Sequence, residues 1–139
     1  MKQRHIILAF ILTICPPSLW AGEIDHDAIW HAICQVESSG NPDAHNPGED
    51  ARGIAQITPI FVRDINRIVG SDKYTHDDAW CVEKSREMFD IYNRNYHPKG
   101  DYERIARCWN GGPTGHKKQA TVAYWNKVQA QLKAHHIEQ

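Results

Sequence analysis

Long apolar runs are scarce in this sequence, and this scarcity limits how the chain can relate to a membrane. The main run, residues 6–14, is too short to span a bilayer as a helix. Basic residues precede it and the small residue Ala21 follows it, which is the order found in a secretory signal peptide. We therefore expect residues 1–21 to be a signal peptide and residues 22–139 to be one exported domain. A short anchor that is never cleaved is the alternative.

A basic stripe is also missing, which argues against nucleic acid as a partner. The chain has 16 Lys and Arg residues against 17 Asp and Glu, for a net charge of −1. Removing the basic residues of the predicted signal peptide makes the mature part more acidic. Domains that bind nucleic acid usually carry clustered Lys and Arg. We expect a periplasmic or extracellular protein with no nucleic-acid partner and no stable membrane anchor after cleavage.

Cysteine is sparse, and its spacing does not suggest a metal site. Three cysteines follow the predicted cleavage point: Cys34, Cys81 and Cys108. Export favours disulfide formation, so we expect one bridge and one free thiol, with all three pairings open. The sequence has no C-x-x-C or H-E-x-x-H pattern. We therefore predict no metal site and no cofactor.

The apolar residues of the mature part recur at three- and four-residue spacing, which is typical of amphipathic helices. Sustained strand alternation is absent, and Gly, Pro, Asn and Asp interrupt the helical patterns. The fold class predicted from this pattern is a compact, mostly α-helical domain. The expected helices run from Asp25 or Asp27 to about Gly40, from Thr58 to Gly70, from Asp77 or Asp78 to His97, from Asp101 to Gly111, and from about Lys118 to Ala134.

Several short stretches combine polar side chains with helix ends or tight turns. In chain order they are Glu37-Ser38, Gly53-Ile54-Ala55-Gln56-Ile57-Thr58-Pro59, Trp109-Asn110-Gly111-Gly112-Pro113, and Tyr124 ahead of Val128. In order and approximate spacing they resemble the lytic transglycosylase domain, a family related to goose-type lysozyme. The resemblance covers roughly residues 26–132 and implies a lysozyme-like helical fold.

The resemblance also implies an activity and a set of site residues. The family binds peptidoglycan glycan strands in a cleft and cleaves the β-1,4 bond between N-acetylmuramic acid and N-acetylglucosamine. Glu37 matches the residue that acts first as general acid and then as general base. The family's reaction leaves a 1,6-anhydromuramic end. Ser38, Gln56, Asn110 and Tyr124 match residues that bind substrate or orient the acid. Small enzymes of this family also work with secretion or conjugation apparatus, so such a partner is a further implication.

Glu37 has to be protonated before this reaction, so we expect its pKa to be raised. Burial against Val36, Ile54 and Ile57 would have that effect, because desolvation disfavours the carboxylate.

Two alternatives stay open. A lysozyme-like muramidase would hydrolyse the same bond, and glycoside hydrolases ordinarily use a second carboxylate. Glu49 and Asp50 are the candidates, although the sequence around them reads as an exposed turn. An inactive peptidoglycan-binding module is the alternative of another class, and the intact Glu37 argues against it.

Overall fold

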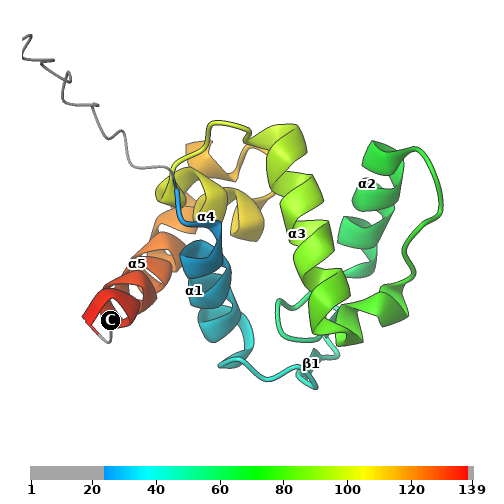
Figure 1. Cartoon of the computed structure of the whole chain (residues 1–139), viewed down its shortest axis with the longest axis horizontal. Helices are drawn as coiled ribbons and strands as arrows, with labels where there is room; N and C mark the ends of the chain where they lie inside the picture. The colour runs from blue at the N-terminus through cyan, green and yellow to red at the C-terminus, as the bar shows by residue number, and fades with distance from the viewer. Residues whose placement is uncertain (1–23, 138–139) are drawn as a thin grey trace, which may run out of the picture.

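The computed structural model describes residues 24–137, and the predicted signal peptide lies outside the described residues. Five α-helices, three 3₁₀ turns and one pair of short strands make up the domain (Figure 1). The α-helices are α1 (His26–Ser38), α2 (Pro59–Val69), α3 (Val82–Tyr96), α4 (Tyr102–Gly111) and α5 (Val122–Ile137). The predicted mostly α-helical class is therefore confirmed.

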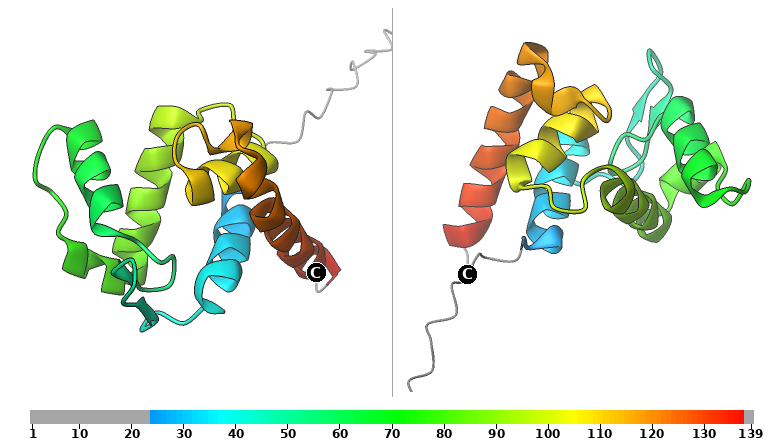
Figure 2. Two further views of the ribbon diagram at one scale, coloured as in Figure 1. Left: turned by 180° about the vertical axis from the view of Figure 1, so that it is seen from behind. Right: turned by 90° about the horizontal axis from the view of Figure 1, so that it is seen from above.

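The helices form two groups, and α3 is the member of the second group that lies next to the first (Figure 1). Helices α1, α4 and α5 pack on one another, while α2 packs on α3 (Figures 1 and 2). The core between them is continuous and includes Ile33 of α1, Phe89 of α3 and Val128 of α5, all fully buried. The Trp30 and Phe89 rings lie 5.2 Å apart, which joins α1 to α3 through aromatic contact.

Capping residues define several helix starts, as the sequence predicted. The Asp25 carboxylate accepts hydrogen bonds from the N–H groups of Asp27 and Ala28 at 2.9 and 3.0 Å. Thr58 caps α2 with Pro59 in its first turn, and the Asp101 carboxylate accepts from the Arg104 N–H at 2.8 Å. These side chains satisfy backbone donors that the first helical turn leaves unpaired.

The segment before α3 differs from the prediction, which began an α-helix at Asp77 or Asp78. Residues His76–Trp80 form a separate 3₁₀ turn, η1, and α3 begins only at Val82. The Asp78 carboxylate turns back to accept a hydrogen bond from the Thr75 N–H at 2.8 Å. Cys81 then adopts an extended backbone, so the two helical segments cannot join.

The last helix also begins later than predicted, at Val122 instead of Lys118. Two 3₁₀ turns, η2 (Gly115–Lys117) and η3 (Gln119–Thr121), occupy the segment before it. The Arg107 guanidinium donates to the Lys118 carbonyl oxygen at 3.0 Å, and the Thr121 hydroxyl donates to the Gly115 carbonyl oxygen at 2.8 Å. Side chains therefore satisfy carbonyl groups that a regular helix would use.

A short antiparallel pair of strands, absent from the prediction, lies between α1 and α2. Strands β1 (His45–Asn46) and β2 (Ala51–Arg52) pair His45 with Arg52 and Asn46 with Ala51. Two residues per strand are too few to show the period-two alternation of a longer strand. The turn between them carries Glu49 and Asp50.

The predicted disulfide is not present. Cys34, Cys81 and Cys108 are all free thiols. They lie on α1, before α3 and on α4, and the Cys108 sulfur contacts His116 Nδ1 at 3.2 Å instead of another cysteine. Within residues 24–137, no helix is long and apolar enough to cross a membrane.

Gly53 should be a position where a side chain cannot be accommodated. Its φ is +74°, and an added Cβ would overlap the carbonyl oxygen of Ala79. We expect Gly53→Ala to lower the free energy of unfolding by roughly 3 kcal/mol or more, from backbone strain plus overpacking. Gly70 provides a matched control, because its φ is +72° but open space surrounds it. Gly70→Ala should cost only about 1 kcal/mol. Equal losses in urea unfolding would contradict the role of the Ala79 contact.

Candidate active site

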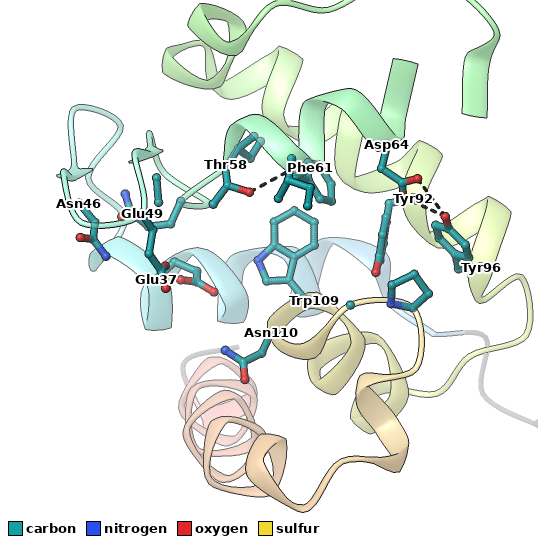
Figure 3. Close-up of a pocket in the computed structure, with 16 residues that line it drawn as sticks. Glu37, Asn46, Glu49, Thr58, Phe61, Asp64, Tyr92, Tyr96, Trp109 and Asn110 are labelled. Carbon is teal, nitrogen blue, oxygen red and sulfur yellow. Dashed lines mark hydrogen bonds between the residues drawn. The ribbon is translucent and has the colours of Figure 1, made fainter. Parts of the chain in front are cut away.

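Glu37 lies in the last turn of α1 and lines a groove of about 620 Å³. Figure 3 shows how side chains are distributed along this groove. Glu37, Glu49 and Asn46 lie at one end and Trp109 lies in the middle (Figure 3). At the other end are the side chains of Asp64, Tyr92 and Tyr96. The groove therefore has a polar end that contains the predicted acid and a largely aromatic end.

Tyr124, which lies on the last helix, α5, holds the Glu37 carboxyl. Its hydroxyl donates a hydrogen bond of 2.7 Å to Glu37 Oε1, although the two residues are 87 positions apart. Packing of α5 against α1 brings them together. Both side chains are half-buried. The bond fixes the orientation of the carboxyl at the groove.

Burial raises the pKa of Glu37, because desolvation penalises the charged form. Hydrogen bonding by Tyr124 and Trp109 stabilises the carboxylate and acts in the opposite direction. The negative charge of Glu49 raises this pKa further, whereas Lys127 lowers it. The net result is a carboxyl group that holds its proton more strongly than an exposed glutamate does.

Of the three apolar residues expected around Glu37, only one lines the groove. Ile57 is buried and is one of the residues that line the groove. Val36 and Ile54 are partly buried and pack against the core instead of lining the groove.

Tyr124 itself has a raised pKa, first through burial and then through the charge of Glu37. It therefore remains a neutral hydrogen-bond donor.

Gln56 lines the groove, but its amide nitrogen is used within the loop that carries it. Nε2 donates to the carbonyl oxygens of Ala44 and Gly53 at 3.1 and 3.0 Å. Gln56 also has a positive φ of 52°, a conformation that costs energy in a residue other than glycine. The structure thus places Gln56 at the site with its donors occupied and its carbonyl oxygen left as the group that could face a ligand.

Ser38 does not line the groove. Its hydroxyl lies 2.7 Å from the Ile54 carbonyl oxygen and 3.2 Å from that of Cys34. The contact with Ile54 ties the end of α1 to the loop that carries Gln56. The structure therefore gives Ser38 a place behind the acid, where it can set the distance between α1 and that loop.

Asn110 lies near the end of α4, and its exposed side chain lines the groove. Among the residues that the structure describes, its amide has no hydrogen-bond partner, so its donor and its acceptor are both available to a ligand in the groove. Helix α4 ends one residue later at Gly111, and Gly112 caps it with a φ of 80°. Helix α4 therefore presents Trp109 and Asn110 together.

Glu49 was a candidate second carboxylate, although the sequence around it reads as an exposed turn. The turn between β1 and β2 brings it to the same end of the groove as Glu37 (Figure 3). Asp50 is directed elsewhere: it accepts hydrogen bonds from His45 at 3.1 Å and from Arg52 at 3.0 Å, and these contacts lower its pKa. Of the two candidate second carboxylates, only Glu49 reaches the groove.

The aromatic end of the groove was missed at the sequence level. Tyr96 donates from its hydroxyl to Asp64 at 2.9 Å, and Phe61 packs edge-on against Trp109 at 4.9 Å. These residues belong to α2, α3 and α4, so no local motif links them.

In the described part of the chain, no cluster of three or more His, Cys, Asp or Glu side chains is arranged to hold a metal ion.

The fold and the site together define a class of protein. A small helical domain presents one half-buried carboxyl, held by a tyrosine, to an elongated groove. The chain belongs to the transglycosylase SLT domain family, whose model matches residues 20–132. The family predicted from the four sequence stretches is confirmed.

Curated relatives carry lysozyme names. A lysozyme of Magallana gigas is 28% identical over 129 residues, which cover 91% of this chain and 90% of that protein. Invertebrate-type lysozyme 3 of Caenorhabditis elegans is 30% identical over 115 residues, or 72% of this chain and 81% of that protein. Lysozyme 1 of Crassostrea virginica is 30% identical over 102 residues, or 71% of this chain and 55% of that protein. No solved structure matches the chain significantly. The family and these relatives support a lysozyme-like enzyme that cleaves glycosidic bonds.

Removing the Tyr124 hydroxyl should raise the pKa of Glu37 above its already raised value. The hydroxyl donates to the carboxylate and so favours the ionised form. In Tyr124→Phe this stabilisation is lost, and the midpoint for the Glu37 carboxyl carbon in an NMR pH titration should move to higher pH. Tyr102→Phe, which removes a hydroxyl bonded to the Asp25 N–H, is the control. A midpoint that falls in Tyr124→Phe would contradict the assigned hydrogen bond.

Proposed function

We propose that this protein is an exported lytic transglycosylase that cleaves the β-1,4 bond between N-acetylmuramic acid and N-acetylglucosamine in peptidoglycan. The observation that carries the proposal is the half-buried Glu37 carboxyl, whose pKa is raised and whose orientation Tyr124 fixes at the side of a groove. General acids need a proton at the operating pH, and burial shifts the pKa of Glu37 in the direction that favours the protonated form.

Glu37 acts twice in the proposed reaction. The protonated carboxyl first gives its proton to the glycosidic oxygen, and the bond from that oxygen to the muramic C1 breaks. The resulting carboxylate then removes the proton from the 6-hydroxyl of the same sugar. The 6-oxygen attacks C1 and closes the 1,6-anhydro ring, so no water is consumed. Tyr124 donates to the carboxylate during the interval in which it is charged.

The neighbouring residues hold the strand and the acid. Asn110 offers both hydrogen-bonding groups of its amide to the acetamido substituents of the sugars. Trp109, between the polar and aromatic ends of the groove, offers a flat surface to a sugar ring. Gln56 contributes its carbonyl oxygen to the same strand. Ser38 is a positioning residue, because it acts through the Ile54 carbonyl oxygen.

The site of action follows from the substrate and from the predicted signal peptide. Peptidoglycan lies outside the cytoplasm, so the mature domain works in the periplasm or the extracellular space. A secretion or conjugation apparatus that needs a local opening in the wall is a partner consistent with this activity.

Hydrolysis by a muramidase is the second candidate, and the position of Glu49 favours it. A hydrolase needs a carboxylate that activates water or forms a covalent intermediate. Glu49 is exposed and lines the same end of the groove as Glu37. The relatives named as lysozymes support the same alternative.

Digestion of purified cell walls tests the activity and the role of Glu37. The wild-type protein should release muropeptides that end in 1,6-anhydromuramic acid, detected by mass spectrometry as products one water lighter than hydrolytic ones. Glu37→Gln keeps the shape of the side chain, but its amide cannot act as a general acid or as a general base. Its rate of lysis should fall by about a thousandfold or more, because general acid catalysis and base catalysis are both lost.

Binding of glycan strands should survive in Glu37→Gln, which separates loss of chemistry from loss of fold. Unchanged lysis by this variant would exclude Glu37 as the acid. A wild-type protein that binds strands without cutting them would instead indicate a binding module.

Glu49→Gln distinguishes the two reaction outcomes. A transglycosylase does not need a second carboxylate, so this variant should keep its anhydro products and lose less than about tenfold in rate. Asp43→Asn, an exposed carboxylate in the same loop region and outside the groove, controls for the change in net charge. Hydrolytic products from the wild type, together with their loss in Glu49→Gln alone, would replace the transglycosylase proposal with the muramidase.

A further inference from the structure

The charge of the groove suggests which glycan strands it accepts. The described side chains that line it include three carboxyl groups, those of Glu37, Glu49 and Asp64, and neither a lysine nor an arginine. With Glu37 protonated for catalysis, two negative charges remain, one toward each end of the groove (Figure 3). A ligand with negative charge therefore enters a groove whose described lining carries no lysine or arginine, although Lys127, outside the lining, acts on Glu37.

The two remaining carboxylates differ in how far other charges balance them. Asp64 is paired with Arg67, whose Nη2 lies 2.7 Å from its Oδ1, and it also accepts the Tyr96 hydroxyl. Glu49 is exposed, and no ion pair to it exists within residues 24–137. Arg52, a cation of the same loop, is bonded to Asp50 and Asp77 instead. Glu49 is thus the unbalanced charge at the catalytic end of the groove.

The lactyl carboxyl of muramic acid can be either neutral or negatively charged in the strands that reach such a groove. It is uncharged where it forms an amide with a stem peptide, and it is a carboxylate where the peptide has been removed. We propose that the groove selects strands whose lactyl carboxyls are capped as amides over peptide-free strands, with Glu49 as the residue that sets this preference. The inference rests on the proposed function and names the substrate class of the same site.

The size of the preference follows from Coulomb interaction across a solvent-exposed groove. Two like charges about 8 Å apart repel each other by an energy equivalent to about twofold in affinity in bulk water and about thirtyfold near a protein surface, and an open groove lies between these limits. Screening reduces this effect where ionic strength shortens the Debye length to about 3 Å, near 1 M salt. We therefore expect about threefold to tenfold tighter binding of the amidated strand at low salt and a small difference at high salt.

A matched pair of ligands isolates the charge. Peptide-free glycan strands of one length are used either with free lactyl carboxylates or after conversion of those groups to primary amides. Dissociation constants are measured by calorimetry with the Glu37→Gln protein, which cannot cut either ligand, at low salt and at 1 M salt. Tighter binding of the amidated strand at low salt, with loss of the difference at high salt, is the expected result. Equal binding at low salt, or tighter binding of the free acid, overturns the proposal.

The variant Glu49→Gln in the same background tests the residue. The preference for the amidated strand should shrink to less than about twofold at low salt, because the unbalanced charge is gone. Asp72→Asn is the matched control, since Asp72 is exposed and lies outside the groove. It should leave the preference unchanged. A preference that persists in Glu49→Gln, or one that shrinks equally in both variants, shows that Glu49 does not set it.

Failure of this inference is distinguishable from failure of the proposed function. Wild-type protein that cuts cell walls but binds both strands equally refutes the charge preference and leaves the activity standing. Wild-type protein that neither cuts walls nor binds either strand refutes both.

Discussion

The hydrogen bond from the Tyr124 hydroxyl to Glu37 Oε1 joins the first and last helices at the point where the chemistry is proposed. It depends on α1 and α5 packing along their length, so the shared core sets its geometry. Burial and this bond act in opposite directions on the acid: desolvation favours the proton, while the donor favours the carboxylate. A group that must give up a proton and later take one back needs both influences, because either alone would hold it in one state.

Much of the fold could be predicted because its helices carry local start signals. Asp25, Thr58 and Asp101 each cap a helix with their own side chain, so the sequence shows these boundaries without reference to distant residues. Glu37 and Tyr124 were found differently. Nothing in the spacing of two residues 87 positions apart indicates contact, and only the resemblance to a family paired them.

The features that the sequence did not predict depend on contacts between distant segments. Arg107 and Thr121 hold carbonyl groups that would otherwise extend the last helix toward Lys118. The aromatic end of the groove draws Asp64 and Tyr96 from different helices. Cysteine count alone suggested a bridge, but pairing requires thiols that face each other, and Cys108 contacts His116. In each case tertiary packing decides between local options that are close in energy.

The outcome of bond cleavage depends on which hydroxyl reaches the sugar C1 after the glycosidic bond breaks. The 6-hydroxyl is always present, since it belongs to the substrate, whereas a water molecule must be held and deprotonated by a carboxylate. Asp50 cannot serve, because it does not line the groove and its carboxylate is bonded to His45 and Arg52. Glu49 lines the groove, but it lies in an exposed turn, and no hydrogen bond or ion pair among residues 24–137 fixes its side chain. A water on such a side chain is poorly positioned for attack, and this favours the intramolecular reaction.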